Sequence, residues 1–191
     1  MSSSYLTNPA VFLIQTLFGL YILVVVLRFL LQLFRADFYN PVSQFIVKAT
    51  TPVLRPLRRI IPGLAGLDLA SIVLAWLLQA VALLLVGMVL GLGFRPLGAL
   101  LWAIPALTEL VINIFLYGIL IQVILSWIAP ASHNPAISLL YTLTEPILRP
   151  ARRLLPPISG LDLSPMLVLI GLMLLKMLLL PPLRLITGSP F

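Results

Sequence analysis

The chain has 191 residues, of which 61% are hydrophobic and 9% charged, and its mean hydropathy is +1.17. A soluble domain carries about 25% charged residues, so this composition excludes a water-soluble globule and predicts a protein whose solvent is lipid. The net charge of +7 is better explained by residues that orient the protein in the membrane and contact anionic lipid than by binding of nucleic acid, because the few cations lie beside apolar stretches.

Cysteine is absent, which excludes disulfides, thiolate metal sites and cysteine nucleophiles. The single histidine, His133, excludes a multi-histidine metal site. The sequence therefore predicts neither a metal nor a cofactor.

Four apolar stretches, over residues 10–34, 69–94, 106–128 and 163–186, each exceed the roughly 20 residues that a helix needs to cross the hydrocarbon core. Backbone polar groups in lipid have to bond within their own segment, so each stretch is predicted to be a helix. The first is not expected to be a cleavable signal peptide, since no basic residue precedes it, its apolar part is too long and no small-residue cleavage site follows. The expected fold class is an all-α membrane protein with four transmembrane helices.

One segment occurs twice, as TPVLRPLRRIIPGLAGLDL from Thr51 and as EPILRPARRLLPPISGLDL from Glu145. Aligning residues 40–69 with 134–163 gives identity at 14 of 30 positions, so the chain divides into a repeat over residues 1–96 and a repeat over residues 97–191. Each repeat consists of a span, an interfacial loop and a span. Two spans return the chain to its starting side, which predicts two hairpins of the same orientation.

The basic residues are unevenly divided between the two sides of the membrane. The loops inside the repeats hold eight of the twelve, whereas the opposite side holds only Arg95 and Arg184. The positive-inside rule then predicts that both repeat loops are cytoplasmic and both termini outside. The eight loop residues are Arg35, Lys48, Arg55, Arg58, Arg59, Arg149, Arg152 and Arg153.

The loops at residues 40–62 and 134–156 are predicted to contain amphipathic helices that lie in the membrane interface. Asn40-Pro41 and Asn134-Pro135 are typical helix starts, with an Asn cap followed by Pro in the first turn. In the first repeat, four polar residues are expected to point away from the apolar stripe: Ser43, Gln44, Lys48 and Thr51. The stripes are Val42, Phe45, Ile46, Ala49 and Val53 in the first repeat, and Ala136, Leu139, Leu140, Leu143 and Ile147 in the second.

Two prolines in each loop, Pro52 and Pro56 or Pro146 and Pro150, are expected to divide it into an amphipathic helix and a short kinked basic piece. The three arginines of each basic piece are spaced to share one face at the depth of the lipid phosphates. Two interpretations stay open: the arginines only set topology and contact headgroups, or they form a docking surface for a partner or a specific anionic lipid.

Asp68 and Asp162 precede the second and fourth spans. Each is expected either to cap its helix or to pair with an arginine. Within the spans, Arg28 and Lys176 are interpreted as snorkelling cations, and Glu109 as an acid in the first helical turn. Three polar residues of the spans are interpreted as interhelical hydrogen-bond partners in preference to the lining of a permeation path: Gln79, Asn113 and Gln122. Gly87 and Gly91 are interpreted as a GxxxG helix contact.

The repeated motif resembles the YggT family of bacterial inner-membrane proteins, which also has plastid relatives. The resemblance covers nearly the whole chain, and it implies a multi-pass protein of the bacterial inner membrane. Bacterial relatives have been linked to cell division or shape and to osmotic tolerance; plastid relatives to nucleoid distribution and maturation of a haem-bearing cytochrome complex. Haem ligation does not carry over to this chain. The motif positions are Asn40, Pro41, Pro52, Arg55, Pro56, Arg58, Arg59, Pro62, Gly66 and Asp68, with Asn134, Pro135, Pro146, Arg149, Pro150, Arg152, Arg153, Pro156, Gly160 and Asp162 in the second repeat.

No catalytic motif is present, so an enzyme is not expected. The predicted function is a membrane scaffold or assembly factor that presents two equivalent basic platforms to membrane lipids or to a protein partner. The protein is also predicted to be able to form homo-oligomers. The platform residues are Arg55, Arg58, Arg59, Arg149, Arg152, Arg153 and Lys48. The alternative is a small oligomeric ion channel or an osmotic-stress transporter, with Asn113, Gln79 and Gln122 facing a pore.

Overall fold

The computed structural model describes residues 3–63, 66–128, 134–154 and 162–190, and within these ranges it contains helices and no strand. Four of its six helices are long and apolar enough to cross a membrane, which confirms the predicted all-α membrane fold. The helices are α1 (Ser3–Leu33), α2 (Pro41–Ile60), α3 (Leu69–Val89), α4 (Pro96–Ile128), α5 (Pro135–Leu154) and α6 (Ser164–Thr187).

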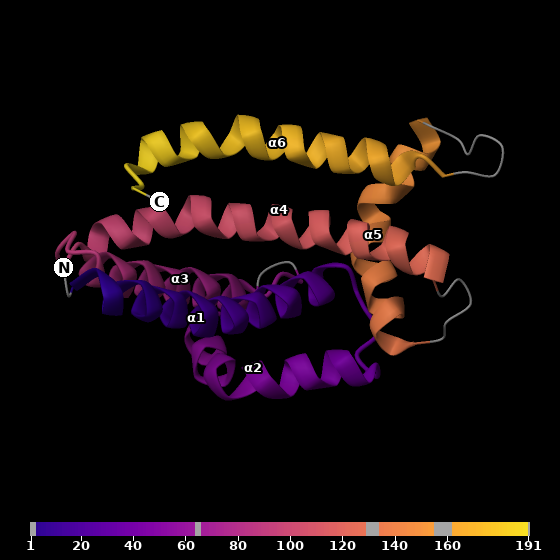
Figure 1. The fold of residues 1–191 in the computed structure, drawn as a ribbon. Coiled ribbons are helices and arrows are strands. Elements are labelled where there is room, and N and C mark those ends of the chain that lie inside the picture. Colours follow the sequence, from indigo (N-terminus) through magenta and orange to yellow (C-terminus); the bar gives the residue numbers. More distant parts are fainter. Residues whose placement is uncertain (1–2, 64–65, 129–133, 155–161, 191) are drawn as a thin grey trace.

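The two hairpins run in the same direction, as the repeat predicts. Figure 1 shows α1 and α4 leading away from the end that holds both termini, and α3 and α6 returning to it. Helix α3 packs against α1 and α4, and α6 packs against α4 and α5. Helix α5 lies across the opposite end of the bundle (Figure 1).

The ends of the long helices differ from the predicted spans. Helix α3 ends at Val89, and Gly91 follows it with φ +76°, so Gly91 closes the helix and does not form a GxxxG face with Gly87. The amide of Leu92 donates to the carbonyl of Gly87 at 2.9 Å in this left-handed termination.

Helix α4 begins at Pro96, ten residues before the predicted start, and it continues through Pro105, whose ring is buried. Glu109 therefore lies more than three turns inside the helix, and the prediction that it occupies the first turn is wrong. Proline suits the first position of a helix because its missing amide has no intrahelical partner there.

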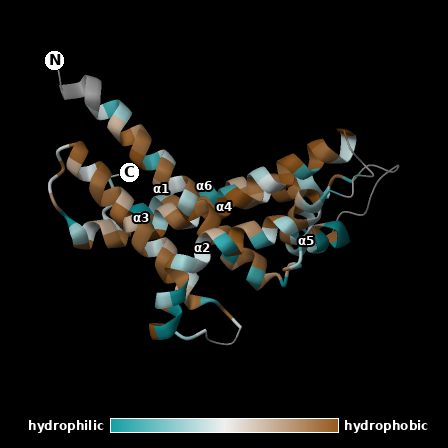
Figure 2. Cartoon of the chain, turned by 90° about the horizontal axis from the view of Figure 1, so that it is seen from below, coloured by the Kyte–Doolittle hydropathy of each residue, from teal (hydrophilic) through white to brown (hydrophobic). Residues whose placement is uncertain are grey.

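The interfacial helices are unbroken. Helix α2 contains Pro52 and Pro56, and α5 contains Pro146 and Pro150, so the predicted division at the prolines is wrong. A buried leucine lies between the two prolines of each helix, Leu54 or Leu148, and both are fully buried. Packing of these side chains against the bundle compensates for the lost amide donors. Figure 2 shows the long helices as mostly hydrophobic, and α2 and α5 as mixed.

The face that α2 turns to the bundle differs from the apolar stripe, which the sequence predicted to lie in the membrane interface. Its buried residues are Ser43, Ile46, Thr50 and Leu54. Of the predicted stripe, Phe45 is 66% exposed, and Ala49 and Val53 are also exposed. The apolar arc of α2 is therefore wider than the stripe, and only part of it contacts protein. The rest faces outward, as expected for a helix that also contacts lipid.

Helix α5 buries more of its apolar stripe against protein than α2 does, although the sequence predicted that this stripe faces the membrane interface. Leu139 and Leu143 are buried, while Leu140 and Ile147 are half-buried. Only Ala136 of that stripe is exposed. Helix α5 contacts α1, α2, α4 and α6, so nearly all of its apolar arc is used in packing.

Candidate functional site at the interfacial helices

The two interfacial helices begin with the predicted Asn caps and are joined at those caps. The Asn40 side chain accepts from the amide of Val42 at 2.9 Å, and the Asn134 side chain accepts from the amide of Ala136 at 2.9 Å. The Nδ2 group of Asn40 also donates to the carbonyl of Pro135 at 2.8 Å. This bond across the repeats fixes the start of α2 against the start of α5.

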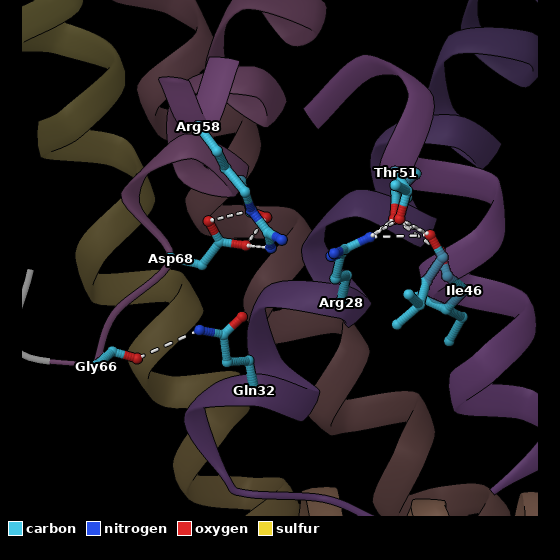
Figure 3. A network of polar contacts seen from close by, with 10 residues as sticks. Arg28, Gln32, Ile46, Thr51, Arg58, Gly66 and Asp68 are labelled. Carbon is cyan, nitrogen blue, oxygen red and sulfur yellow. Dashed lines mark hydrogen bonds and ion pairs between the residues drawn. The ribbon is translucent and has the colours of Figure 1, made fainter. Parts of the chain in front are cut away.

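Arg28 of α1 holds α2 in place. Its Nη1 group donates to the Thr50 hydroxyl at 2.6 Å and to the Val47 carbonyl at 3.0 Å. It also donates to the Thr51 hydroxyl at 3.1 Å (Figure 3). The residue is 7% exposed. The prediction that Arg28 snorkels to the surface is therefore wrong, because its guanidinium is taken up by the polar side of a neighbouring helix.

The second repeat has an uncharged counterpart of this contact. A shift of 94 positions places Gln122 of α4 at the position of Arg28, and Thr144 of α5 at the position of Thr50. The Thr144 hydroxyl donates to the side-chain oxygen of Gln122, and both residues are buried. This confirms the prediction of an interhelical bond for Gln122, whereas Gln79 has no such partner in the described part of the chain.

Asp68 pairs with an arginine of its own repeat. Its carboxylate accepts from Nη2 of Arg58 and, at 3.4 Å, from Nε of the same residue (Figure 3). It also accepts from the Ser71 hydroxyl at 2.6 Å. The Asp68 side chain is 5% exposed and does not cap a backbone amide of α3. Burial by itself raises the pKa of this carboxyl, but the bonds from Arg58 and Ser71 outweigh it and leave the pKa lowered.

The loop before Asp68 needs the motif glycine. Gly66 has φ +83°, a conformation that favours glycine over residues with a side chain. Its carbonyl accepts a long hydrogen bond of 3.5 Å from Nε2 of Gln32 (Figure 3). The matching Gly160, together with Pro156 and His133, lies outside the described residues.

Asp162 repeats the pairing and extends it. It accepts from Nε of Arg152 at 2.9 Å, and it caps α6 by accepting from the amide of Ser164 at 2.9 Å. Arg152 also donates to Glu145 at 2.7 Å, and Arg149 lies 3.7 Å from Glu145. Burial lowers the pKa of Arg152, but the hydrogen bonds to Asp162 and Glu145 outweigh it and leave the pKa raised.

The pairing confirms that both aspartates bind arginines, but it overturns the prediction of two equivalent platforms. In the second repeat, Glu145 and Asp162 neutralise Arg149 and Arg152, and only Arg153 lacks an acidic partner among the described residues. In the first repeat, Arg58 is the one basic residue of α2 for which the described residues include an acidic partner. Three exposed cations of α2 have no acidic partner in the part of the chain that the structure describes: Lys48, Arg55 and Arg59.

A second polar cluster, which the sequence did not predict, ties α6 to α4. Glu109 of α4 accepts from Lys176 at 2.9 Å and from Arg184 at 2.7 Å, and Lys176 also donates to Asn113 at 2.9 Å. The prediction that Lys176 snorkels is therefore wrong, and the interhelical role of Asn113 is confirmed. The spacing of Glu109 and Asn113 by one helical turn was the available signal, but the partner helix could not be identified from it.

Each repeat also has a cleft beside its Arg–Asp pair. The first has a volume of about 350 Å³ and is lined by Gln32, Arg58, Gly66 and Asp68 among others. The second has a volume of about 520 Å³. Its lining includes Ser126, Arg152 and Asp162, which occupy the positions of Gln32, Arg58 and Asp68 in the second repeat. The duplication has therefore preserved a cleft in each repeat, together with its ion pair.

The comparisons with known proteins follow the same two halves. The family model described as CCB3/YggT matches residues 7–89 and residues 101–183. An uncharacterized protein of Pseudomonas aeruginosa is 51% identical over 187 residues, covering 97% of this chain and 95% of the relative. The uncharacterized protein YggT of Escherichia coli K12 is 37% identical over 170 residues, covering 89% and 88%. No solved structure matches the chain.

Proposed function

This chain belongs to the CCB3/YggT family, and from that premise we propose that it is a scaffold or assembly protein of the bacterial inner membrane, not an enzyme. In this proposal α2 binds anionic lipid or a protein partner at the cytoplasmic surface. A link to cell division or shape, or to osmotic tolerance, is proposed by family resemblance, and so is assembly into homo-oligomers.

One observation carries the proposal: α2 presents unpaired cations next to an exposed apolar arc. Lys48, Arg55 and Arg59 are exposed and have no acidic partner among the described residues. Phe45 is 66% and Ile60 81% exposed on the adjoining face. Each basic residue near an anionic surface contributes about 1 kcal/mol, and exposed apolar side chains add to the binding.

Lipid retained by the purified full chain tests the proposal. Native mass spectrometry counts bound phosphatidylglycerol on the wild type, on the Arg55→Gln/Arg59→Gln variant and on the repeat-matched control, Arg149→Gln/Arg153→Gln. We expect the first variant to lose affinity by about 10- to 30-fold, from two contacts of about 1 kcal/mol each. The control is expected to change less, because Arg149 already pairs with Glu145. Equal losses in both variants would contradict the role of α2.

A second candidate function is a small ion conduit formed by oligomers. The observation that favours it is the polar cluster of Glu109, Asn113 and Lys176 on helices that could cross the membrane. The charges of this cluster are engaged with one another, which favours a structural role. Ion flux in proteoliposomes that is abolished by Asn113→Leu or Gln122→Leu would support the conduit and refute the scaffold.

A further inference from the structure

The second-repeat cleft differs chemically from its counterpart in the first repeat. It lies where the end of α4, helix α5 and the start of α6 meet, at the depth where the apolar helices give way to connecting segments. Both charges of its ion pair are accessible, since the Arg152 and Asp162 side chains are 35% and 37% exposed. In the first repeat, the carboxylate of Asp68 is only 5% exposed.

The ion pair in this cleft has unused bonding capacity for both signs of charge. A guanidinium has five N–H donors, and Arg152 uses one for Asp162 and one for Glu145. A carboxylate has about four acceptor positions, and Asp162 uses one for Arg152 and two for the amide and the hydroxyl of Ser164, which leaves one for a ligand. A ligand with an anionic and a cationic group can therefore lie along the pair without separating it.

The surroundings of the pair favour a lipid over a soluble ligand. Trp127 and Tyr141 line the cleft and are 81% and 39% exposed, and such side chains are enriched where membrane and water meet. Val123 and Leu163 also line the cleft, and Leu163 is 44% exposed, so the cleft has an apolar wall as well as its ion pair. A headgroup held by the ion pair would place its acyl chains along these residues.

We propose that the second-repeat cleft binds a zwitterionic lipid headgroup of the phosphatidylethanolamine type, with the phosphate on Arg152 and the ammonium on Asp162. The duplicated loops have then diverged, so that α2 attracts anionic lipid and the second cleft selects a lipid with balanced charge. This site goes beyond the proposed function and does not require α2 to bind anything.

Lipid binding by the full chain in detergent tests the site, with phosphatidylethanolamine, phosphatidylcholine and phosphatidylglycerol compared by native mass spectrometry. Asp162→Asn is expected to lower the affinity for phosphatidylethanolamine about tenfold and to leave phosphatidylglycerol binding unchanged, because a charge-assisted bond is lost. Asp68→Asn, at the repeat-equivalent position, is the matched control and is expected to leave phosphatidylethanolamine binding unchanged. Phosphatidylcholine, whose ammonium has no N–H, is expected to bind more weakly than phosphatidylethanolamine.

A second variant and a soluble competitor test the same site independently of Asp162. If Asp162→Asn does not fold, Trp127→Leu, which leaves the ion pair intact, has to lower phosphatidylethanolamine affinity by itself. Soluble phosphoethanolamine at millimolar concentration is expected not to displace the lipid, and displacement would identify a soluble ligand instead. Equal binding of all three lipids, or unchanged binding by both the Asp162 and Trp127 variants, would overturn the proposal.

Discussion

At the scale of single residues, the two repeats use different chemistry for the same task. Arg28 and Gln122 occupy equivalent positions, and each binds the equivalent threonine of its interfacial helix, Thr50 or Thr144. Arg28 does so with a charge that has no carboxylate within ion-pair distance among the described residues. Hydroxyl and carbonyl oxygens of α2 take the place of water, which is the condition under which a cation is tolerated inside a membrane protein.

Replacing Arg28 tests this contact. Arg28→Leu is expected to lower the free energy of unfolding by about 1.5–3 kcal/mol, the range for hydrogen bonds to charged groups. Arg28→Gln is expected to cost less, because the second repeat makes the bond with glutamine. Thermal unfolding in detergent measures both variants, and equal destabilisation by Leu and Gln would show that the Thr50 bond contributes nothing.

The lowered pKa values of Asp68 and Asp162 make the stability of the fold depend on pH. The pKa values of Asp68 and Asp162 are both lowered in the folded protein, so each stabilises the fold above its unfolded pKa of about 4 and loses that contribution as pH falls below it. The Asp68 side chain is the more buried, so Asp68→Asn is expected to reduce the acid sensitivity of the melting temperature more than Asp162→Asn. Melting curves from about pH 7 to pH 3 check this order, and the reverse order would contradict it.

At the scale of helices, tertiary packing overrides the effect of proline. Pro52 and Pro56 each remove an amide donor, yet α2 continues to Ile60. Thr50 and Leu54, on either side of Pro52, are fully buried against the bundle and hold the chain in helical geometry. An isolated peptide lacks this packing, and its prolines would interrupt the helix.

Adjacent residues of α2 provide a matched test. Leu54→Ala removes a fully buried side chain and is expected to cost about 2–5 kcal/mol, whereas Val53→Ala, at a position 40% exposed, is expected to cost less than about 1 kcal/mol. Unfolding titrations in detergent measure the difference. If both substitutions have the same effect, the buried face of α2 has been assigned wrongly.

Helix α6 depends on its polar contacts more than the other long helices do, because little of its surface is buried. Glu109→Gln leaves Lys176 and Arg184 without a carboxylate, so we expect a loss of about 2–3 kcal/mol in the free energy of unfolding. Glu145→Gln, in the interfacial cluster, is the control and is expected to cost less than about 1 kcal/mol, since water reaches its partners. Equal effects would indicate that the α4–α6 cluster is solvated.

At the scale of the whole molecule, the duplication brings the two interfacial helices into contact with each other, and the hydrogen bond between Asn40 and Pro135 joins them. The side of the membrane on which they lie is predicted by the positive-inside rule. The chain has no cysteine, so single introduced cysteines report on topology without background.

Cysteines at Gln44, Ser138 and Phe94, all exposed, test the topology with an impermeant thiol reagent in intact cells. Ser43 is unsuitable because it is buried. We expect labelling at Phe94 in the loop between the hairpins, and protection at Gln44 and Ser138 until the cells are opened. The opposite labelling pattern would show that the protein has the inverse orientation, with the cations of α2 on the outer side of the membrane.

The sequence by itself determined the four apolar helices, the two parallel repeats and the starts of α2 and α5, because length, composition and caps act locally along the chain. The pairing of Asp68 and Asp162 with arginines was foreseen as one of two alternatives. Only the tertiary structure decided that Arg28 binds α2, that α6 is tied to α4 through Glu109, and that Glu145 neutralises one platform. These contacts depend on which faces of separate helices meet, and a one-dimensional pattern of polar and apolar residues does not specify the rotation of one helix against another.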